Sequence, residues 1–348
     1  MFQILTLLGL FENFWRNLVG LKFAVIGSNC FTGTHVVDWL LEDPLNFVVG
    51  LSRSPEKSSL YLPYKKKNLN NFRFVQLDLN HDTQRLLQIL DELKPEFVIN
   101  VAALSEVYQS HLTPNEYFQV NTTAVVRLAN ELRSRKWLKR YIHTSSAEVY
   151  GACSGALHEQ APLNPSTPYA VSKAAADMYL LTLAKNFDFP VTIVRSTNVY
   201  GKHQQLFKII PRTIIYLKQG KTIELHGGGS SIKCFIHIRD VVEGIKKIVE
   251  HPSPSFIYHF STDNDYNVKK VVSLLCEKMG CPFEKHVKEV GERLGQDPRY
   301  WLNYDKAKKE LGWYPQVSFE KGIDETIQWI EQNWDEIQKE SLLYIHKI

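Results

Sequence analysis

The sequence predicts an α/β protein in which a doubly wound parallel sheet is followed by a smaller, mainly helical C-terminal domain. Short apolar segments alternate with helix-length periodic segments from Lys22 to Arg195, and the alternation loosens after Arg195. A turn with spaced glycines follows the first apolar segment. Strand–helix alternation at this spacing implies right-handed crossovers, so the strands run parallel and helices cover both faces. The length of 348 residues allows two domains.

The predicted strands are short and rich in apolar and β-branched residues: Lys22–Ile26, Phe47–Leu51, Phe72–Val75, Phe97–Val101, Arg140–Thr144 and Pro190–Arg195. The helices between them are expected at 32–43, 83–93, 114–134 and 168–186. Two further strands are expected at Phe235–Ile238 and Phe256–Phe260. The remaining helices are expected at Leu206–Gln219, Arg239–Glu250, Lys269–Met279, Lys306–Leu311 and Phe319–Asn333.

Composition and charge exclude several classes of protein. The net charge of +4 is small, and the densest basic run, Lys65–Lys67, has no interleaved aromatic residues, so it predicts a solvated loop and no nucleic-acid partner. Five cysteines without a CxxC pair or a nearby histidine cluster argue against a disulfide framework and a metal site, and they fit a reducing cytoplasm. No run approaches the roughly eighteen apolar residues of a membrane span. The segment from Met1 to Gly20 lacks a basic start and carries Glu12, which favours an amphipathic extension packed on the body over a signal peptide.

The turn from Gly27 to Gly33 lies where the first strand ends and the first helix begins. Glycines at such a turn allow backbone N–H groups to approach a pyrophosphate at a helix N-terminus. The spacing G-x-x-G-x-x-G is present except that Cys30 replaces the middle glycine. The turn and its place in the alternating pattern predict a dinucleotide site of the Rossmann type, with contacts from Gly27, Asn29, Cys30, Phe31, Thr32 and Gly33.

The end of the second strand indicates which dinucleotide binds. NAD sites place an acidic residue there to bind the ribose 2′-hydroxyl, whereas this strand runs into Ser52 and Arg53 without an acid. Arg53 and the neighbouring serines can hold a 2′-phosphate, so NADP is favoured over NAD; the alternative is an ordinary surface arginine. Asp78, after the third strand, is placed to accept a hydrogen bond from an adenine amino group, and a helix cap is the competing interpretation.

Ser146, Glu148, Tyr169 and Lys173 form the candidate catalytic set. Tyr169 and Lys173 are four residues apart, so they share one helix face. An ammonium group beside a phenol favours the phenolate, which predicts a tyrosine base near neutral pH. Ser146 can share a proton with this phenol, and Glu148 is a second, separate base. Oxidation of an alcohol needs only one base, so a further step is indicated.

These motifs resemble the extended short-chain dehydrogenase/reductases that act on nucleotide sugars, from about Leu21 to about Trp334. Within that family the chain is most similar to the 4,6-dehydratases of the dTDP-glucose type. The segments that carry this similarity are Pro168–Asp177, Tyr200–Gln205 with Ile209–Pro211, and Gly295–Tyr300. The resemblance implies an extension over 1–20, an NAD(P)-binding domain over 21–200 with a returning segment near 235–260, a nucleotide-sugar-binding domain over 201–335, and a tail over 336–348.

The resemblance also implies individual roles. Ser146, Tyr169 and Lys173 match the family's hydroxyl, base and ribose-binding lysine, and Glu148 matches the glutamate that removes the sugar C5 proton. Further cofactor contacts are implied at Leu79, Ala102, Ala103 and Asn121. Substrate contacts are implied at Ser105, Asn198, Lys208, Lys233 and Arg299, with Lys233 in place of the family's usual arginine. Dimers are common in the family through helices such as 114–134 and 168–186, although apolar faces there fit packing on the sheet equally well.

The pattern departs from the family at Ala147. Dehydratases of the dTDP-glucose type have an aspartate there that protonates the departing C6 hydroxyl, and GDP-mannose-type relatives and UDP-glucuronate decarboxylases have a serine. Ala147 supplies no proton, so that role passes to Glu148 or to a water. The competing hypotheses are a 4-epimerase, a decarboxylase on the same scaffold, and a cofactor-binding scaffold without catalysis. Asp297–Tyr300 resembles enzymes of pyrimidine nucleotides, whereas Gly50–Arg53 resembles the NADP-using GDP-mannose group.

Overall fold

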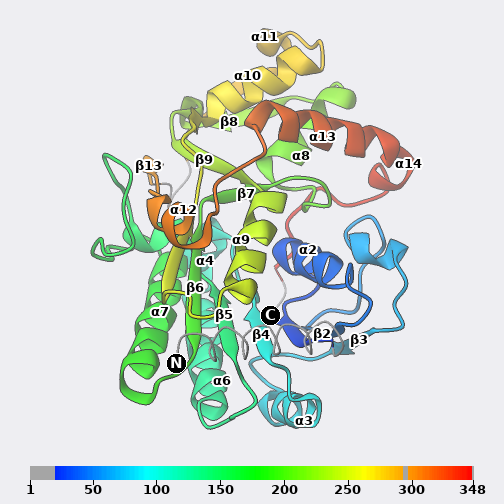
Figure 1. The fold of residues 1–348 in the computed structure, drawn as a ribbon. Coiled ribbons are helices and arrows are strands. Elements are labelled where there is room, and N and C mark those ends of the chain that lie inside the picture. The colour runs from blue at the N-terminus through cyan, green and yellow to red at the C-terminus, as the bar shows by residue number, and fades with distance from the viewer. Residues whose placement is uncertain (1–19, 293–296, 347–348) are drawn as a thin grey trace.

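A parallel sheet of seven strands forms the centre of the computed structural model, which describes residues 20–292 and 297–346 (Figure 1). The strand order is β10-β6-β5-β4-β1-β2-β3. The strands are β1 (Lys22–Ile26), β2 (Phe47–Ser52), β3 (Phe72–Gln76), β4 (Phe97–Asn100), β5 (Arg140–Thr144), β6 (Val191–Ser196) and β10 (Ile257–Phe260). Every strand pair is parallel, and β1 and β2 are buried along almost their whole length, as expected for strands covered on both faces. The expected doubly wound fold is confirmed.

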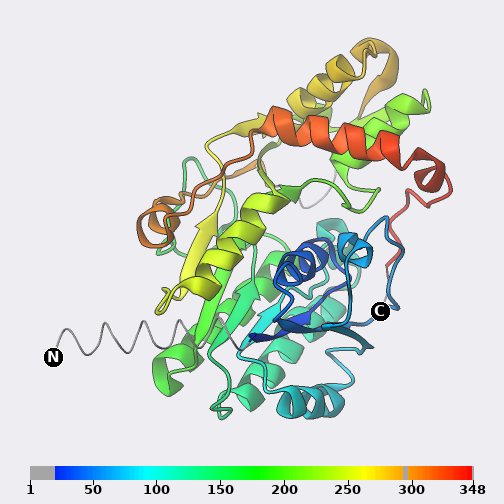
Figure 2. The ribbon, with the colours of Figure 1, turned by 45° about the vertical axis from the view of Figure 1, so that its right-hand side comes forward.

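Helices cover both faces of this sheet (Figures 1 and 2). One face carries α2 (Phe31–Leu40), α9 (Ile238–Glu250) and α12 (Asp305–Leu311), which pack together over the side chains of Phe23 and Val25. The other face carries α3 (Thr83–Leu93), α6 (Ala124–Leu132) and α7 (Pro168–Phe187) over Ala24 and Ile26. The alternation of these β1 side chains between two apolar clusters fixes the register of the whole sheet.

The helix expected over 114–134 is present from Pro114 to Leu132. It consists of α5 (Pro114–Phe118), a wider π-helical turn over Gln119–Thr123, and α6, which follow one another without a gap and with helical backbone angles at both junctions. A separate short helix, α4 (Val107–Leu112), precedes it. Within the π-helical turn the side-chain amide of Asn121 bonds to the backbone N–H and C=O of Leu104, at 2.9 and 3.0 Å, and to Ser172 Oγ at 3.0 Å. The extra residue in the turn therefore fixes the loop after β4 against α7.

The C-terminal part is less purely helical than expected. Its helices are α8 (Ile209–Lys218), α10 (Val268–Lys278), α11 (Phe283–His286), α13 (Phe319–Gln332) and α14 (Trp334–Ile337). They pack around two small sheets, one of β7 (Asn198–Tyr200), β9 (Ile232–His237), β11 (Asp265–Asn267) and β13 (Arg299–Tyr300), the other of β8 (Ile223–His226) and β12 (Val287–Val290). The strand expected at Phe235–Ile238 belongs to the first of these sheets rather than to the central one. Pairing of β9 with β7, directly after β6, joins this part to the central sheet.

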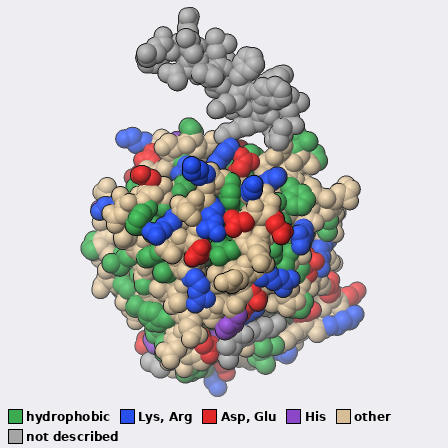
Figure 3. Space-filling model, turned by 90° about the horizontal axis from the view of Figure 1, so that it is seen from below, with side chains coloured by type: hydrophobic (Ala, Val, Ile, Leu, Met, Phe, Trp, Pro, Cys, Tyr) green, Lys and Arg blue, Asp and Glu red, His purple; other side chains and the backbone are tan. Residues whose placement is uncertain are grey.

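Among the described residues, no helix is long and apolar enough to cross a membrane. The predicted extension over residues 1–20 lies outside the described residues except at its last position. Figure 3 shows one face of the molecule, where Lys and Arg side chains alternate with Asp and Glu side chains. The absence of a nucleic-acid partner stays a prediction.

A buried ion pair joins α7 to β6. Asp177 Oδ2 lies 2.9 Å from Arg195 Nε, with side-chain exposures of 0 and 2%. Ser145 Oγ donates to the same carboxylate oxygen at 2.8 Å, and Arg195 donates to the Tyr150 hydroxyl. The Tyr150 hydroxyl also lies 2.7 Å from His259 Nε2 on β10. Four elements of the chain are thus tied to one carboxylate.

Removal of this carboxylate is expected to destabilise the protein strongly. Asp177→Ala leaves the Arg195 guanidinium buried and unpaired, which costs about 3–5 kcal/mol. The matched control, Asp91→Ala, breaks the half-exposed Asp91–Arg135 pair and is expected to cost about 0–1 kcal/mol. Urea denaturation of both variants measures the difference. Equal losses of stability in the two variants would contradict the assignment.

Candidate active site

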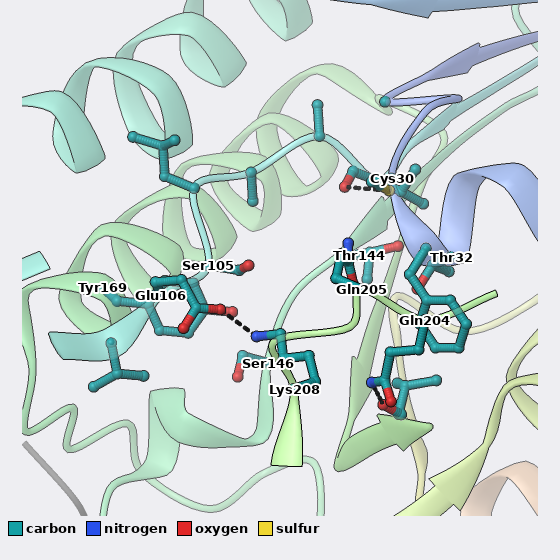
Figure 4. Close-up of a pocket in the computed structure, with 18 of the residues that line it drawn as sticks. Cys30, Thr32, Ser105, Glu106, Thr144, Ser146, Tyr169, Gln204, Gln205 and Lys208 are labelled. Carbon is teal, nitrogen blue, oxygen red and sulfur yellow. Dashed lines mark hydrogen bonds and ion pairs between the residues drawn. The ribbon is translucent and has the colours of Figure 1, made fainter. Parts of the chain in front are cut away.

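A cavity of about 690 Å³ opens at the C-terminal ends of the parallel strands (Figure 4). The loops after β1, β2, β4, β5 and β6 line it from the sheet side, and residues from α8, β9 and β13 line it from the C-terminal part. This edge of an open α/β sheet is where such folds bind ligands. Among the predicted site residues, all but Gly33, Asn121 and Arg299 line this cavity.

The glycine turn leaves room for a ligand against the backbone. Gly27 has a φ of +90°, and a Cβ on it would lie 2.7 Å from the backbone nitrogen of Ala102. A Cβ on Gly33 would lie 2.1 Å from the carbonyl oxygen of Gly27, so Gly33 allows α2 to pack on the turn rather than lining the cavity. The Cys30 sulfur accepts from the Gly33 N–H at 3.3 Å and caps α2. Cys30 therefore replaces the middle glycine without closing the cavity, and the N-terminal turn of α2 stays open to an anion.

The end of β2 forms one end of the cavity. Ser52 and Arg53 line it, and Ser52 Oγ accepts from the Asn29 N–H at 2.9 Å. Glu56, the nearest acid after β2, is turned away and accepts from the Tyr64 hydroxyl at 2.8 Å. Asp78 and Leu79, which follow the neighbouring strand β3, also line the cavity, and Asp78 Oδ1 accepts from the Asn80 N–H at 2.7 Å. Asp78 thus stabilises a local turn and also forms part of the cavity wall.

The four candidate catalytic residues line the same part of the cavity. Glu148 lies on the single turn η3 (Ala147–Tyr150), and Ser146 caps the start of this turn. Ser146 Oγ accepts from the Glu148 N–H at 3.2 Å. Tyr169 and Lys173 lie on the first two turns of α7, which begins with Thr167 as its cap and Pro168 at its first position. The Asp177–Arg195 pair and Ser145 hold these two elements together.

The electrostatics of Tyr169 differ from the prediction. Burial raises the pKa of the phenol above its ordinary range, and the nearby Glu148 carboxylate raises it further, while a hydrogen bond with Ser146 lowers it. The Lys173 ammonium does not offset this burial, since it donates to the Thr144 carbonyl at 2.7 Å and lies 3.3 Å from His143 Nε2. Burial lowers the pKa of Lys173 to about 8. The expected lowering of the Tyr169 pKa by Lys173 is therefore not found in the protein without its ligands.

The pKa of Glu148 lies close to neutral pH. Burial raises the pKa of its carboxyl to about 7, which Lys233 opposes and Asp297 reinforces. Lys233 donates to the Asp297 carbonyl at 3.0 Å and lies 4.1 Å from the centre of the Tyr300 ring. A carboxyl of this kind can accept a proton and return it at the same pH, as general acid–base catalysis requires.

Ala147 points away from this chemistry. It is 1% exposed and packs in an apolar cluster with Val149, Tyr150, Tyr300 and Leu302. The carboxyl of Glu148 is therefore the acid that η3 presents to the cavity.

The substrate-side predictions divide into two groups. Ser105, Asn198, Lys208 and Lys233 line the cavity. Lys208 forms an ion pair with Glu106, which Figure 4 shows spanning the cavity in front of Tyr169 and Ser146. Arg299 instead pairs with Asp265 at 2.7 Å and does not reach the lining, so its binding role stays a prediction.

Several lining residues were not among the predicted site residues. Glu106 and Tyr300 directly follow Ser105 and Arg299 in the sequence, so adjacency was a usable signal for both. Asp297 lies in a segment that carried the family resemblance. Phe207, Tyr344 and Ile345 also line the cavity, and no local pattern marks them.

The lining fits a large polar ligand such as a dinucleotide. The Thr144 and Thr197 hydroxyls and the Asn198 amide nitrogen are buried at the cavity without a hydrogen-bond partner among the described residues. Buried polar atoms without partners cost free energy, and a ligand with hydroxyl and phosphate groups would satisfy them. The residues present therefore suit the predicted nicotinamide cofactor.

Comparisons with known proteins show the family. The family model described as GDP-mannose 4,6 dehydratase matches residues 25–326. The chain is 31% identical over 331 residues to a human dTDP-D-glucose 4,6-dehydratase, covering 91% of this chain and 93% of the relative.

Two solved structures share the fold. One is DesIV, a dTDP-glucose 4,6-dehydratase from Streptomyces venezuelae with NAD and TYD bound, with a TM-score of 0.84 at 29% identity over 91% of this chain and 98% of that one. The other is a UDP-glucuronic acid 4-epimerase from Bacillus cereus with UDP-glucuronic acid and NAD, with a TM-score of 0.80 at 25% identity over 90% and 99%. By its glycine turn, its Ser146–Tyr169–Lys173 set and these matches, the chain belongs to the GDP-mannose 4,6 dehydratase family, the nucleotide-sugar 4,6-dehydratases of the extended short-chain dehydrogenase/reductase fold.

Proposed function

We propose that this protein is a nucleotide-hexose 4,6-dehydratase, a lyase that converts an NDP-hexose to an NDP-4-keto-6-deoxyhexose. The observation that carries the proposal is the Glu148 carboxyl, which lines the cavity beside Ser146 and Tyr169 and has a pKa raised to about 7. A 4-epimerase needs no such group, because its chemistry is confined to C4. A dehydratase needs it to move the C5 proton.

Oxidation at C4 is the first step. When bound, the nicotinamide supplies a hydride acceptor and later a hydride donor, so that hydride leaves C4 of the sugar and returns to C6. Tyr169 takes the proton of the C4 hydroxyl, and Ser146, which shares a hydrogen bond with that phenol, holds the same hydroxyl. Lys173, fixed on the Thr144 carbonyl, is placed as the ribose-binding lysine.

Loss of water follows from the new C4 ketone, which acidifies the C5 proton. Glu148 removes this proton and the C6 hydroxyl leaves as water. Ala147 cannot protonate that hydroxyl, and the carboxyl of Glu148 holds a proton once it has taken the one from C5. We therefore assign both transfers to Glu148, which a pKa near 7 supports. When hydride adds to C6 of the resulting 5,6-alkene, C5 takes up a proton from solvent, which completes the 4-keto-6-deoxy product.

The nucleotide end of the substrate is assigned to the C-terminal lining. Lys208 and Lys233 supply positive charge for a diphosphate, and Asn198 supplies an amide nitrogen without a partner among the described residues. Ser105 completes this group from the loop after β4. A pyrimidine nucleotide is favoured, since the Asp297–Tyr300 segment lies on this side and the human relative is a dTDP-D-glucose enzyme.

For the cofactor we propose NADP in preference to NAD. Arg53, Ser54 and Lys57 line the cavity after β2, and Glu56 is directed at Tyr64 and Lys65. A ribose 2′-phosphate would meet cations and hydroxyls there, as NADP sites require. The related DesIV structure holds NAD, so this choice distinguishes the present chain from that neighbour.

We also propose a homodimer in the cytoplasm. The support for a dimer is a set of exposed apolar side chains on the helices named for it: Phe118 on α5, and Val171, Met178 and Phe187 on α7. Five free cysteines are consistent with a reducing compartment. The division into a cofactor domain over 21–200 and a substrate domain over 201–335 remains part of the proposal.

A 4-epimerase is the second candidate, because Ala147 removes the acid that dTDP-glucose-type dehydratases use. Incubation with a panel of nucleotide sugars in deuterated water separates the two. The expected product is an NDP-4-keto-6-deoxyhexose that has lost one water relative to the substrate and carries deuterium at C5. Mass spectrometry and NMR detect these two changes. A C4 epimer without deuterium at C5 would overturn the dehydratase, and a pentose product would indicate decarboxylation.

The rate of C5 exchange is expected to rise with pH through about 7. Glu148 accepts a proton only when ionised, and burial holds it half-protonated near that pH. Glu148→Gln is expected to lower the rate about 10²–10⁴-fold and to remove this pH dependence. The control Glu243→Gln changes an exposed carboxyl on α9 and should leave the profile unchanged. Full activity in Glu148→Gln would rule out the base role.

NADP⁺ is expected to bind more tightly than NAD⁺, as measured by titration calorimetry. Arg53→Ala should weaken NADP⁺ binding by about tenfold or more, because a charge-assisted hydrogen bond contributes about 1.5–3 kcal/mol. The effect of Arg53→Ala on NAD⁺ binding should be much smaller. The control Arg135→Ala removes the Arg135–Asp91 ion pair outside the cavity and should change the binding of neither dinucleotide. Tighter binding of NAD⁺ by the unchanged protein would refute the preference.

A further inference from the structure

The segment Gln338–His346 after α14, here called the C-terminal strap, crosses from the C-terminal helices to the sheet side of the cavity. Figure 2 shows the red segment after α14 descending towards the level of the parallel sheet. Tyr61 donates to Glu340 at 3.1 Å near the start of the strap, and Leu342 packs on the apolar cluster of the C-terminal helices. The strap is thus held along its course rather than only at its end.

The far end of the strap is anchored on α5. His346 forms an ion pair with Glu116, and its ring lies parallel to that of Tyr117 with 6.3 Å between centroids. The Tyr344 hydroxyl lies 2.9 Å from His346 Nδ1 and also hydrogen-bonds to the Tyr117 hydroxyl. Tyr117 in turn donates to the Glu106 carbonyl at 2.6 Å, so this anchor is continuous with the loop after β4.

Two strap side chains form part of the cavity wall. Tyr344 and Ile345 line the cavity, and the Tyr344 ring contacts that of Phe207 edge-on at 5.3 Å. Burial raises the pKa of the Tyr344 phenol, Glu106 raises it further, and Arg53 lowers it. Arg53 follows β2 and Glu106 follows β4, and both line the same cavity as Tyr344. Leu343, which directly precedes Tyr344, is 75% exposed and does not line the cavity.

We propose that the C-terminal strap retains the dinucleotide, with Tyr344 and Ile345 as cofactor-binding residues that cover it from the open side of the cavity. The inference rests on the proposed nicotinamide cofactor. Hydride that leaves C4 must return to C6 of the same sugar, so the reduced cofactor must not leave between the two transfers. A ring and an aliphatic side chain held across the cavity slow such release and exclude water. Exchange of the cofactor then requires the strap to detach from α5.

Release of the dinucleotide from the full-length protein tests this proposal. The protein is loaded with NADP⁺ or NAD⁺, and dissociation is followed by stopped-flow tryptophan fluorescence after mixing with excess competitor. Tyr344→Ala is expected to speed release at least about tenfold, since most changes in affinity at one site appear in the dissociation rate. His346→Ala, which removes the anchor but no lining atom, should act in the same direction. Leu343→Ala is the matched control in the same segment and should leave release unchanged.

Three outcomes decide the matter. Unchanged release in both Tyr344→Ala and His346→Ala, with unfolding temperatures like that of the parent protein, would overturn the proposal. Faster release in Leu343→Ala to the same degree would also overturn it, because the effect would then be a general loosening of the tail. If Tyr344→Ala fails to fold, Tyr344→Phe keeps the ring and loses the ties to His346 and Tyr117, and it should still release the dinucleotide faster. Binding is measured without turnover, so these results stand whichever sugar reaction the protein catalyses.

Discussion

The Asp177 carboxylate is the constraint on which the arrangement of the site depends. It is fully buried, pairs with Arg195 on β6, and accepts from Ser145 at the end of β5. Through Arg195 it also fixes Tyr150 at the end of η3, which carries Glu148. Because Asp177 lies about one turn after Lys173 on α7, a single buried charge sets the distance between the helix that carries Tyr169 and the turn that carries Glu148. Buried pairs contribute little net stability compared with apolar packing, but they tolerate few alternative arrangements.

Burial also sets the chemistry of the cavity. It raises the pKa values of Tyr169 and Glu148 and lowers that of Lys173 to about 8, so each group is displaced towards its neutral form. The pKa values of Glu148 and Lys173 thereby come close to neutral pH, where each group can both accept and donate a proton. The pKa of Tyr169 is moved further from neutral pH. Positive charge that arrives with the ligands would lower the pKa of Tyr169 and favour the phenolate that the proposed first step requires.

Much of the fold was predictable because its signals are local. The alternation of apolar strands with periodic helices gave the parallel sheet, and Pro168 after Thr167 marked the start of α7 to the residue. The predicted helix over 114–134 is present from Pro114 to Leu132, but its π-helical turn was not predicted, because that turn carries Asn121, whose hydrogen-bond partners Leu104 and Ser172 are distant in sequence. The prediction that Lys173 lowers the pKa of Tyr169 failed for a similar reason: the Thr144 carbonyl binds the ammonium. Helical spacing places two residues on one face but does not decide which partner a flexible side chain takes.

The sequence by itself determined the sheet, the glycine turn, and the identity of the Ser146, Glu148, Tyr169 and Lys173 set, since each depends on residue type and short-range spacing. Only the tertiary structure decided that Ala147 packs in an apolar cluster, that Arg299 pairs with Asp265 outside the cavity, and that Glu106 and Lys208 face each other across it. It also decided that Tyr344 and Ile345, nearly two hundred residues from Glu148, form part of the same wall. These contacts join segments that no periodic pattern relates, and their geometry is fixed by the packing of whole elements rather than by any local preference of the chain.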